Sequence, residues 1–331
     1  MTRRRITVAG AGIIGLWQAL MLARRDYQVT LVDREVEPLN ACASRHAGAM
    51  LAPWVEAESA PDEVRDFGVE GLAIWRDVYP GIVNNGSLVV AVARDLPDLT
   101  RFAKLTHEHR TLDRAAIAAL EPDLADRFST ALFFPDEAHV ATPHALAFLH
   151  QACQDAGVDF HFGRALEESD CDSVIVDCRG LGARHRLADL RGVRGERLLI
   201  RSSDVSFARP VRLLHPRHPL YVVPWGENRY LVGATMIESE DAGPVSVRSA
   251  LELLGAAYAL HPAFGEAEVL EMNAGVRPAF PNNVPRARIV DGGRSIMVNG
   301  AYRHGYLLAP VLAAAVADYL DTGALHPLLQ T

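Results

Sequence analysis

The chain has 331 residues, of which 49% are apolar and 22% charged, a balance that excludes intrinsic disorder and collagen-like repetition. At ~150 residues per domain, this length accommodates two domains. The formal net charge of −8 argues against nucleic acid as a partner.

The N-terminal segment has the pattern of a strand, a helix and a second strand. A β-type run at residues 6–9 precedes apolar residues at helical spacing over residues 13–25, and residues 29–33 have the pattern of a second buried strand. The basic residues 3–5 imitate the start of a secretion signal, but spaced glycines and Gln18 interrupt the apolar run behind them. We therefore predict a βαβ unit that opens a folded domain.

Three glycines between the first strand and the helix form the motif G-x-G-x-x-G. Gly10 permits a tight turn, Gly12 lets a pyrophosphate approach the backbone, and Gly15 lets the helix pack on the strand. Free N–H groups at the helix start then face the phosphates. Asp33 ends the second strand, where a carboxylate can bind ribose hydroxyls. The segment predicts a dinucleotide site, with Arg34 interpreted as a surface or adenine-edge residue.

The rest of the chain alternates between helical and strand patterns. Residues 41–58 are rich in small residues and lack amphipathic spacing, which indicates backbone that passes close to a bulky group. The predicted helices are residues 67–78, 112–120, 143–156, 246–258 and 307–320. The predicted strands are residues 86–92, 132–134, 158–162, 173–177, 197–200, 220–223, 230–232 and 296–299. This order predicts an α/β nucleotide domain into which a second, β-rich domain is inserted.

The cysteines and the paired histidines predict neither disulfides nor a metal site. No C-x-x-C pair occurs among Cys42, Cys153, Cys171 and Cys178. This cysteine usage predicts a reducing, cytoplasmic location. The histidines that stand close together have no third ligand at useful spacing and are interpreted as loop residues: His107, His109, His215 and His218.

Four segments carry a resemblance to a known family. They are residues 44–53, 174–183, 275–278 and 299–310, and they follow one another in the family's order. On these motifs the chain resembles the FAD-dependent D-amino-acid oxidase superfamily, most closely its glycine oxidase-like branch. The resemblance implies an FAD-binding, doubly wound Rossmann-type domain with an inserted antiparallel, β-rich α+β substrate domain. It places residues 1–83, 140–194 and 275–331 in the first domain, and residues 84–139 and 195–274 in the second.

The resemblance also implies a substrate site. Arg277 occupies the position of the family's carboxylate-binding arginine, and a guanidinium fork matches a carboxylate better than an ammonium does. Tyr221 aligns with a tyrosine that hydrogen-bonds the same carboxylate, and a half-buried strand tyrosine is the alternative. Met236 is expected to line the pocket, where a methionine is otherwise core filler. Arg303 matches a second arginine near the substrate mouth.

The cofactor implied by the resemblance is FAD, bound non-covalently because no cysteine follows Cys178. His304 lies in the loop expected over the flavin pyrimidine, whereas His46 could bond the ring or only fill space. The residues expected to bind FAD are Gly10, Gly12, Ile13, Ile14, Gly15, Asp33, Arg34, Ser44, Arg45, His46, Ala47, Gly48, Met50, Leu51, Ala165, Cys178, Gly180, Arg277, Tyr302, Arg303, His304, Gly305, Tyr306 and Leu307.

The implied reaction is oxidative deamination of a small amino acid or secondary amine. A hydride leaves Cα for flavin N5, the imine gives a 2-oxo acid and ammonia, and oxygen becomes hydrogen peroxide. No obvious catalytic pair of Asp, Glu or His emerges, so we expect catalysis by positioning and electrostatics. The alternatives are an FAD-dependent dehydrogenase with another electron acceptor, an NAD-dependent dehydrogenase and a non-catalytic flavoprotein subunit. No membrane span is expected, and self-association stays open.

Overall fold

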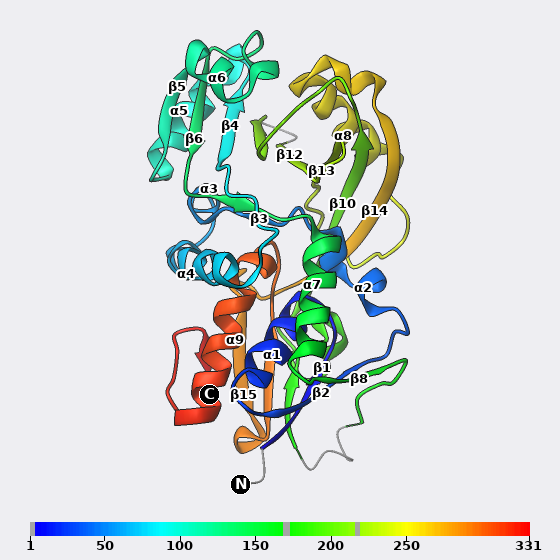
Figure 1. Ribbon diagram of the computed structural model, residues 1–331. Helices are drawn as coiled ribbons and strands as arrows, with labels where there is room; N and C mark the ends of the chain where they lie inside the picture. Colours follow the sequence, from blue (N-terminus) through cyan, green and yellow to red (C-terminus); the bar gives the residue numbers. More distant parts are fainter. Residues whose placement is uncertain (1–3, 168–172, 216–218) are drawn as a thin grey trace.

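The computed structural model describes residues 4–167, 173–215 and 219–331, and within these ranges the chain builds two large β-sheets (Figure 1). The order of the seven-stranded sheet is β17 (Leu329–Gln330), β15 (Arg286–Val290), β16 (Ser295–Asn299), β9 (Val174–Asp177), β1 (Arg5–Ala9), β2 (Gln28–Asp33) and β8 (Asp159–Phe162). β1 pairs in parallel with both β2 and β9, and β16 is parallel to β9. The parallel arrangement confirms the predicted doubly wound α/β fold and brings the carboxyl ends of β1, β2 and β9 to one edge.

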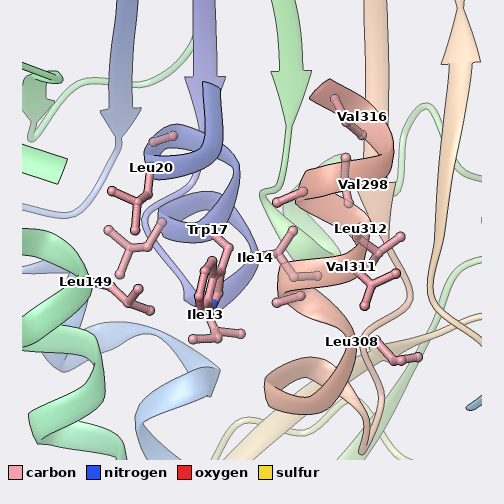
Figure 2. Packing of buried hydrophobic residues seen from close by; sticks show 14 of the residues in the cluster. Ile13, Ile14, Trp17, Leu20, Leu149, Val298, Leu308, Val311, Leu312 and Val316 are labelled. Carbon is pink, nitrogen blue, oxygen red and sulfur yellow. The ribbon is translucent and has the colours of Figure 1, made fainter. Parts of the chain in front are cut away.

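Four long helices pack beside this sheet, namely α1 (Ile13–Ala23), α4 (Asp62–Val78), α7 (Thr142–Asp155) and α9 (Gly305–Thr322). Figure 2 shows α1 between α7 and α9, with Leu149 of α7 on one side and Leu312 of α9 on the other. The rings of Trp17 and Trp75 meet edge to face at 4.9 Å. Apart from Gln18, α1 carries no polar side chain, as expected for a helix that is buried between the sheet, α7 and α9.

The order of the eight-stranded sheet is β14 (Glu268–Ala279), β10 (Arg191–Arg201), β13 (Arg229–Gly233), β12 (Leu220–Pro224), β11 (Val211–Leu214), β4 (Ser87–Ala91), β6 (Thr130–Phe134) and β5 (Arg110–Asp113). Its neighbouring strands are antiparallel except for β11 and β4, which run parallel. The helices that pack with it are α5 (Leu96–Leu105), α6 (Arg114–Leu120) and α8 (Val247–Leu260). It forms the upper part of the molecule in Figure 1.

Short elements join the two sheets. The small-residue segment and the residues just before it fold as α2 (Pro38–Ala41), a 3₁₀ turn (Ala43–His46), β3 (Met50–Leu51) and α3 (Pro53–Glu56). β3 pairs with β7 (Ala138–His139) in a small sheet of its own. Further 3₁₀ turns are Ala93–Asp95, Pro122–Leu124, Gly180–Ala183, Pro262–Glu266 and Asp291–Gly293.

Several elements differ from the sequence predictions. The predicted helix 112–120 begins two residues later, because Leu112 and Asp113 belong to β5 and the Asp113 carboxylate caps α6 by accepting the Ala116 N–H at 2.8 Å. The sequence did not predict α5, β5, β11, β14, β15 or β17. The sequence of β14 does not predict a strand, because this edge strand contains glycine, asparagine and proline, which have low strand propensity.

The two sheets support the proposal of two domains, whose boundaries stay a prediction. β10 starts at Arg191 and β14 ends at Ala279, so both strands of the eight-stranded sheet extend past the predicted boundaries at residues 195 and 274. Within the described residues, no helix combines the length and the apolar content that a membrane span requires.

Two glycines of α4 determine how closely α9 approaches. A Cβ at Gly71 would lie 2.0 Å from the Leu307 carbonyl oxygen, and one at Gly68 would lie 2.7 Å from the Leu307 Cδ2. The mid-helix Gly255 of α8, by contrast, has no atom within 4 Å of a built Cβ.

We predict that Gly71→Ala destabilises the protein by ~1–3 kcal/mol, because an added methyl group forces α4 and α9 apart. Gly255→Ala is the matched control and should stabilise it by ~0.5–1 kcal/mol, since alanine has the higher helix propensity. Urea denaturation followed by circular dichroism measures both changes. Equal effects of the two substitutions would contradict the packing described here.

Candidate active site

A cavity of about 610 Å³ lies between the carboxyl edge of the seven-stranded sheet and the eight-stranded sheet. Its volume falls within the ~300–1,000 Å³ typical of ligand pockets. The predicted site residues that line it are Gly10, Gly12, Ile13, Ile14, Asp33, Arg34, Ser44, His46, Ala47, Gly48, Met50, Ala165, Cys178, Gly180, Tyr221, Met236, Arg277, Tyr302, Arg303, His304, Gly305, Tyr306 and Leu307. Segments from both ends and the middle of the chain therefore meet at one cavity.

The glycine motif forms one end of this cavity. Gly10 has φ +98°, and a Cβ there would lie 2.8 Å from the Cys178 carbonyl oxygen. A Cβ at Gly15 would lie 1.8 Å from the Gly10 oxygen, so this glycine permits the close packing of α1 on β1. The Ile13 N–H, at the start of α1, donates to the Ser44 Oγ at 3.1 Å, which ties the loop after α2 to the helix N-terminus.

Asp33 stands at the carboxyl end of β2 and lines the cavity. Its carboxylate accepts the Ala11 N–H at 2.7 Å and the Glu35 N–H at 2.9 Å. These bonds fix the carboxylate beside the glycine turn, with further acceptor positions for hydroxyl donors. Arg34 is 77% exposed and pairs with Glu35, which agrees with its interpretation as a surface residue.

Tyr221 enters the cavity from β12 and packs closely against two glycines. A Cβ at Gly48 would lie 2.6 Å from the Tyr221 Cε2, and one at Gly233 would lie 3.0 Å from its hydroxyl oxygen. Burial raises the pKa of Tyr221, which keeps the hydroxyl protonated and able to donate.

Arg277 projects from β14 over a gap left by Gly195, where a Cβ would come within 2.2 Å of the guanidinium. Its Nη1 donates to the Thr235 carbonyl oxygen at 3.2 Å. Among the described residues, no carboxylate pairs with this guanidinium within 4.0 Å. Desolvation lowers the pKa of Arg277, although the group stays charged because arginine ionises far above neutral pH. The arrangement leaves a desolvated positive charge facing the cavity.

Glu56, at the end of α3, was not predicted from the sequence but belongs to the cavity wall. Its Oε1 accepts the Arg303 Nη2 at 2.9 Å, and its Oε2 lies 3.4 Å from the His304 Nδ1. The nearby Arg212, which was also missed, bonds Glu58 at 3.3 Å. The only sequence signal for Glu56 is an acidic residue that closes a stretch of small and apolar residues.

The charges of this group are coupled. Desolvation opposes ionisation of Glu56, but the positive charges of Arg303 and Arg212 outweigh it and leave the pKa of the carboxyl below its ordinary value. The Glu56 carboxylate in turn raises the pKa of Arg303. Burial lowers the pKa of His304 to about 4, so its imidazole is neutral at physiological pH. Glu56 thus neutralises Arg303 and leaves Arg277 as the unpaired charge.

Met236 and Tyr302 lie beside Arg303. The Met236 sulfur accepts the Tyr302 hydroxyl at 3.4 Å and the Arg303 Nη1 at 3.5 Å. The Met236 residue is 52% exposed, so it stands at the wall of the cavity rather than in the core.

His46 lines the cavity beside Gly275, and its Nδ1 lies 3.2 Å from the Arg197 Nη2. Burial, followed by the charges of Arg197 and Arg45, lowers the pKa of His46 to about 4. The neutral ring is therefore held by Arg197, and both expected roles toward a flavin stay open.

Three of the predicted residues do not line the cavity. Gly15 packs under the glycine turn, Leu51 is fully buried in the core, and Arg45 lines a separate, smaller pocket. No group of three potential metal ligands occurs in the part of the chain that the structure describes. Cys42, Cys153 and Cys178 are free thiols, whereas Cys171 and His218 lie outside the described residues.

Glu137 supports the short helix that carries Glu56. It is fully buried, its Oε1 accepts the Val55 N–H at 2.8 Å, and its Oε2 is bonded to the Ser87 hydroxyl. Burial raises the pKa of Glu137 from 4.5 to about 8. The folded state therefore favours the neutral carboxyl at pH 7.

The cavity fits FAD on its own geometry. The glycine turn and the N-terminus of α1 form a cradle for a pyrophosphate, and Asp33 is fixed beside it. The N-terminus of α9 opens on the same cavity, where it would favour negative charge on a bound ring. We therefore assign these residues as the ones that would hold FAD.

Known proteins resemble the chain in sequence and fold. The model of a family described as FAD dependent oxidoreductase matches residues 5–319. A protein of Rhizobium etli named thiamine biosynthesis oxidoreductase ThiO is 52% identical over 320 residues, which cover 96% of this chain and 97% of the relative. The glycine oxidase of Geobacillus kaustophilus is 25% identical over 363 residues, or 97% of this chain and 94% of that protein. The crystal structure of glycine oxidase from Bacillus cereus has a TM-score of 0.80 at 23% identity, covering 97% of this chain and 96% of that chain, and shows the shared fold.

We predict that Asp33→Ala weakens FAD binding about 30- to 150-fold without changing substrate preference, since bonds to a charged group contribute ~2–3 kcal/mol. Asp159→Ala, at the start of the edge strand β8, is the control and should retain the flavin. Flavin content after dialysis and fluorescence titration measure the loss. Unchanged occupancy in Asp33→Ala would exclude this placement of the carboxylate.

We also predict that stability falls as the pH rises from about 6 to 8, in part because of Glu137. Its pKa is raised on folding, so its contribution is complete below pH 4.5 and disappears as the pH passes about 8. Glu137→Gln should flatten this decline in thermal midpoint. Glu240→Gln is the control, because Arg184 first and then the Gly192 N–H lower the pKa of Glu240 to about 2, outside the window. Parallel profiles for wild type and Glu137→Gln would refute the assignment.

Proposed function

The chain belongs to the family of FAD-dependent oxidoreductases, and from this premise we propose that it oxidises a small amino acid, with glycine as the first candidate. It is an oxidoreductase of the glycine oxidase and ThiO type that acts on a carbon–nitrogen bond of an amine. In the proposed reaction the amino acid, oxygen and water give a 2-oxo acid, ammonia and hydrogen peroxide. Bound FAD supplies the two-electron acceptor for this chemistry.

The unpaired guanidinium of Arg277 carries the proposal. It is desolvated, it faces the cavity, and its nearest bonded partner is the Thr235 carbonyl oxygen rather than a carboxylate. A substrate carboxylate would supply the missing negative charge through two parallel N–H···O bonds. The protonated hydroxyl of Tyr221 faces the same cavity and can donate a further bond.

The charge balance favours a substrate with one carboxylate. Arg303 is already neutralised by Glu56, and Arg212 is bonded to Glu58, so neither offers a second vacant cationic position. A monocarboxylic amino acid matches the single remaining charge. Its position at Arg277 would orient the amine-bearing carbon, and orientation alone accounts for a large part of such rate enhancements.

Two further parts of the proposal concern the biological setting. The relative from Rhizobium etli is named for thiamine biosynthesis, and at 52% identity we extend that role to this chain. The free thiols of Cys42, Cys153 and Cys178 support a reducing, cytoplasmic location.

The test is a substrate screen of the yellow holoenzyme with glycine, sarcosine, D-alanine and L-proline. We expect glycine or another small amino acid to bleach the flavin anaerobically and to give peroxide in air. If a substrate bleaches the flavin but no peroxide forms in air, the electron acceptor is a compound other than oxygen. Failure of every amino acid to bleach the flavin would refute the amino-acid substrate.

We predict that Arg277→Lys retains FAD and fold but raises KM and lowers kcat/KM on the order of 10²-fold. Lysine keeps the charge, but it loses the paired bonds that orient the carboxylate, and a displacement of ~1 Å carries a cost of this order. Steady-state peroxide production measures the change, and the flavin spectrum reports the fold.

Two controls make this result specific. An amine without a carboxylate, if oxidised at all, should be turned over equally by both forms. Arg288→Lys removes a guanidinium that already pairs with Asp189 on the protein surface and should leave kcat/KM unchanged. Wild-type efficiency of Arg277→Lys toward the best amino acid would overturn the carboxylate-binding role.

A further inference from the structure

A second, smaller pocket of about 120 Å³ lies where the N-terminus of α7 meets the eight-stranded sheet. It is lined by Arg45, Ala141, Pro143, His144, Arg197, Leu199, Trp225, Arg229 and Glu271. None of these residues lines the FAD cavity. Its volume is below the ~300–1,000 Å³ of cofactor and drug-sized sites, so it suits a ligand of only a few heavy atoms.

Positive charge exceeds negative charge around this pocket. Arg45, Arg197 and Arg229 face two carboxylates: Glu271 accepts the Arg197 Nη2 at 2.8 Å, and the exposed Glu227 pairs with Arg229 at 2.9 Å. Arg45, which is half-buried, is left without a carboxylate partner among the described residues, and Arg197 beside it has only 2% of its side chain exposed. A buried excess of positive charge is costly unless an anion compensates it.

Several buried N–H donors of this pocket have no partner among the described residues. They are the Nε and Nη1 of Arg197, the Nε of Arg229 and the indole Nε1 of Trp225. The Arg197 guanidinium also lies 5.7 Å from the Trp225 ring, which holds it in place from one side. Unsatisfied buried donors are rare in folded proteins, and a group of them at one pocket calls for an acceptor.

The N-terminus of α7 adds to this potential. The helix begins at Thr142, and its N-cap residue Ala141 has no side-chain acceptor for the first N–H groups. Both Ala141 and Pro143 line the pocket, so the positive end of a 14-residue helix opens on it.

We propose that this pocket binds a small oxyanion, either inorganic phosphate or a single carboxylate group, with Arg197 as its central ligand. Arg197 can donate a charge-assisted bond from its unpartnered Nε or Nη1, because its Nη2 is already bonded to Glu271 and His46. The Trp225 and Arg229 donors and the α7 N-terminus supply further bonds. The site adjoins the flavin loop, because Arg197 also bonds His46 and the Arg45 carbonyl oxygen accepts the Thr142 hydroxyl at 2.7 Å. The proposal does not depend on which amine the enzyme oxidises.

The test is calorimetric titration of the holoenzyme with inorganic phosphate, with acetate and with chloride at constant ionic strength. We expect phosphate, acetate or both to bind at one site per chain with a dissociation constant of about 1 mM or tighter. Phosphate binding alone identifies an inorganic ion as the ligand. Acetate binding alone identifies a carboxylate where the pocket variants below weaken it; acetate binding that they leave unchanged belongs to Arg277 in the large cavity and counts against the proposal. If neither oxyanion binds more tightly than chloride, the pocket holds only water and the proposal is wrong.

Variants connect the binding to this pocket. Arg197→Met keeps an unbranched apolar stem but removes the guanidinium and its donors. Arg229→Met does the same at the edge of the pocket, where Glu227 left alone is exposed to solvent. We expect each to weaken oxyanion binding at least tenfold, and Arg229→Met keeps the test valid if Arg197→Met does not fold. Arg201→Met, four residues along β10 and paired with Glu268 at the surface, is the control and should bind as wild type does. Equal binding by wild type, Arg229→Met and Arg201→Met would overturn the proposal.

Discussion

Several arginine guanidinium groups are buried in this protein, and the structure of both pockets depends on how each of these positive charges is compensated. Removing a charge from water is costly unless a partner compensates it. Arg303 has the Glu56 carboxylate and Arg197 has Glu271, whereas Arg277 is bonded only to a carbonyl oxygen among the residues described. The places where compensation is incomplete are the places where the structure can accept an anionic ligand. One such place is Arg277 at the large cavity. We propose the small pocket beside α7 as the other, because Arg45 has no carboxylate partner among the described residues and the Nε and Nη1 of Arg197 are unpartnered.

Close backbone approach makes this placement of charge feasible. Gly195 leaves the space occupied by the Arg277 guanidinium, and Gly48 and Gly233 leave the space occupied by the Tyr221 ring. Each of these glycines lies on a different segment from the side chain that it accommodates. Gly68 and Gly71 likewise let α4 approach the first turn of α9, and the residues of that turn line the cavity. Small residues at these contacts therefore position large functional side chains.

The loop between α2 and β3 connects the two pockets. One side of it, with Ser44 and His46, lines the FAD cavity, while Arg45 between them lines the small pocket. Hydrogen bonds fix both sides, from the Ile13 N–H to Ser44 and from the Thr142 hydroxyl to Arg45. The lack of amphipathic spacing in this segment has a structural reason, because residues 41–44 and 46–50 line the FAD cavity in succession and only Arg45 among them lines the small pocket.

The sequence by itself determined the nucleotide-binding half of the molecule. The G-x-G-x-x-G turn, the buried strands around it and Asp33 at the end of β2 lie within one continuous segment, where spacing and periodicity encode local geometry. Family motifs likewise predicted Arg277, Tyr221 and Arg303 as residues of one site, and the structure places all three on one cavity. Tertiary structure alone decided which charges are paired. Glu56 meets Arg303 across 247 positions of sequence, and Arg197 meets His46 across 151. Such pairing depends on the register of strands and the approach of helices, and no local pattern encodes either.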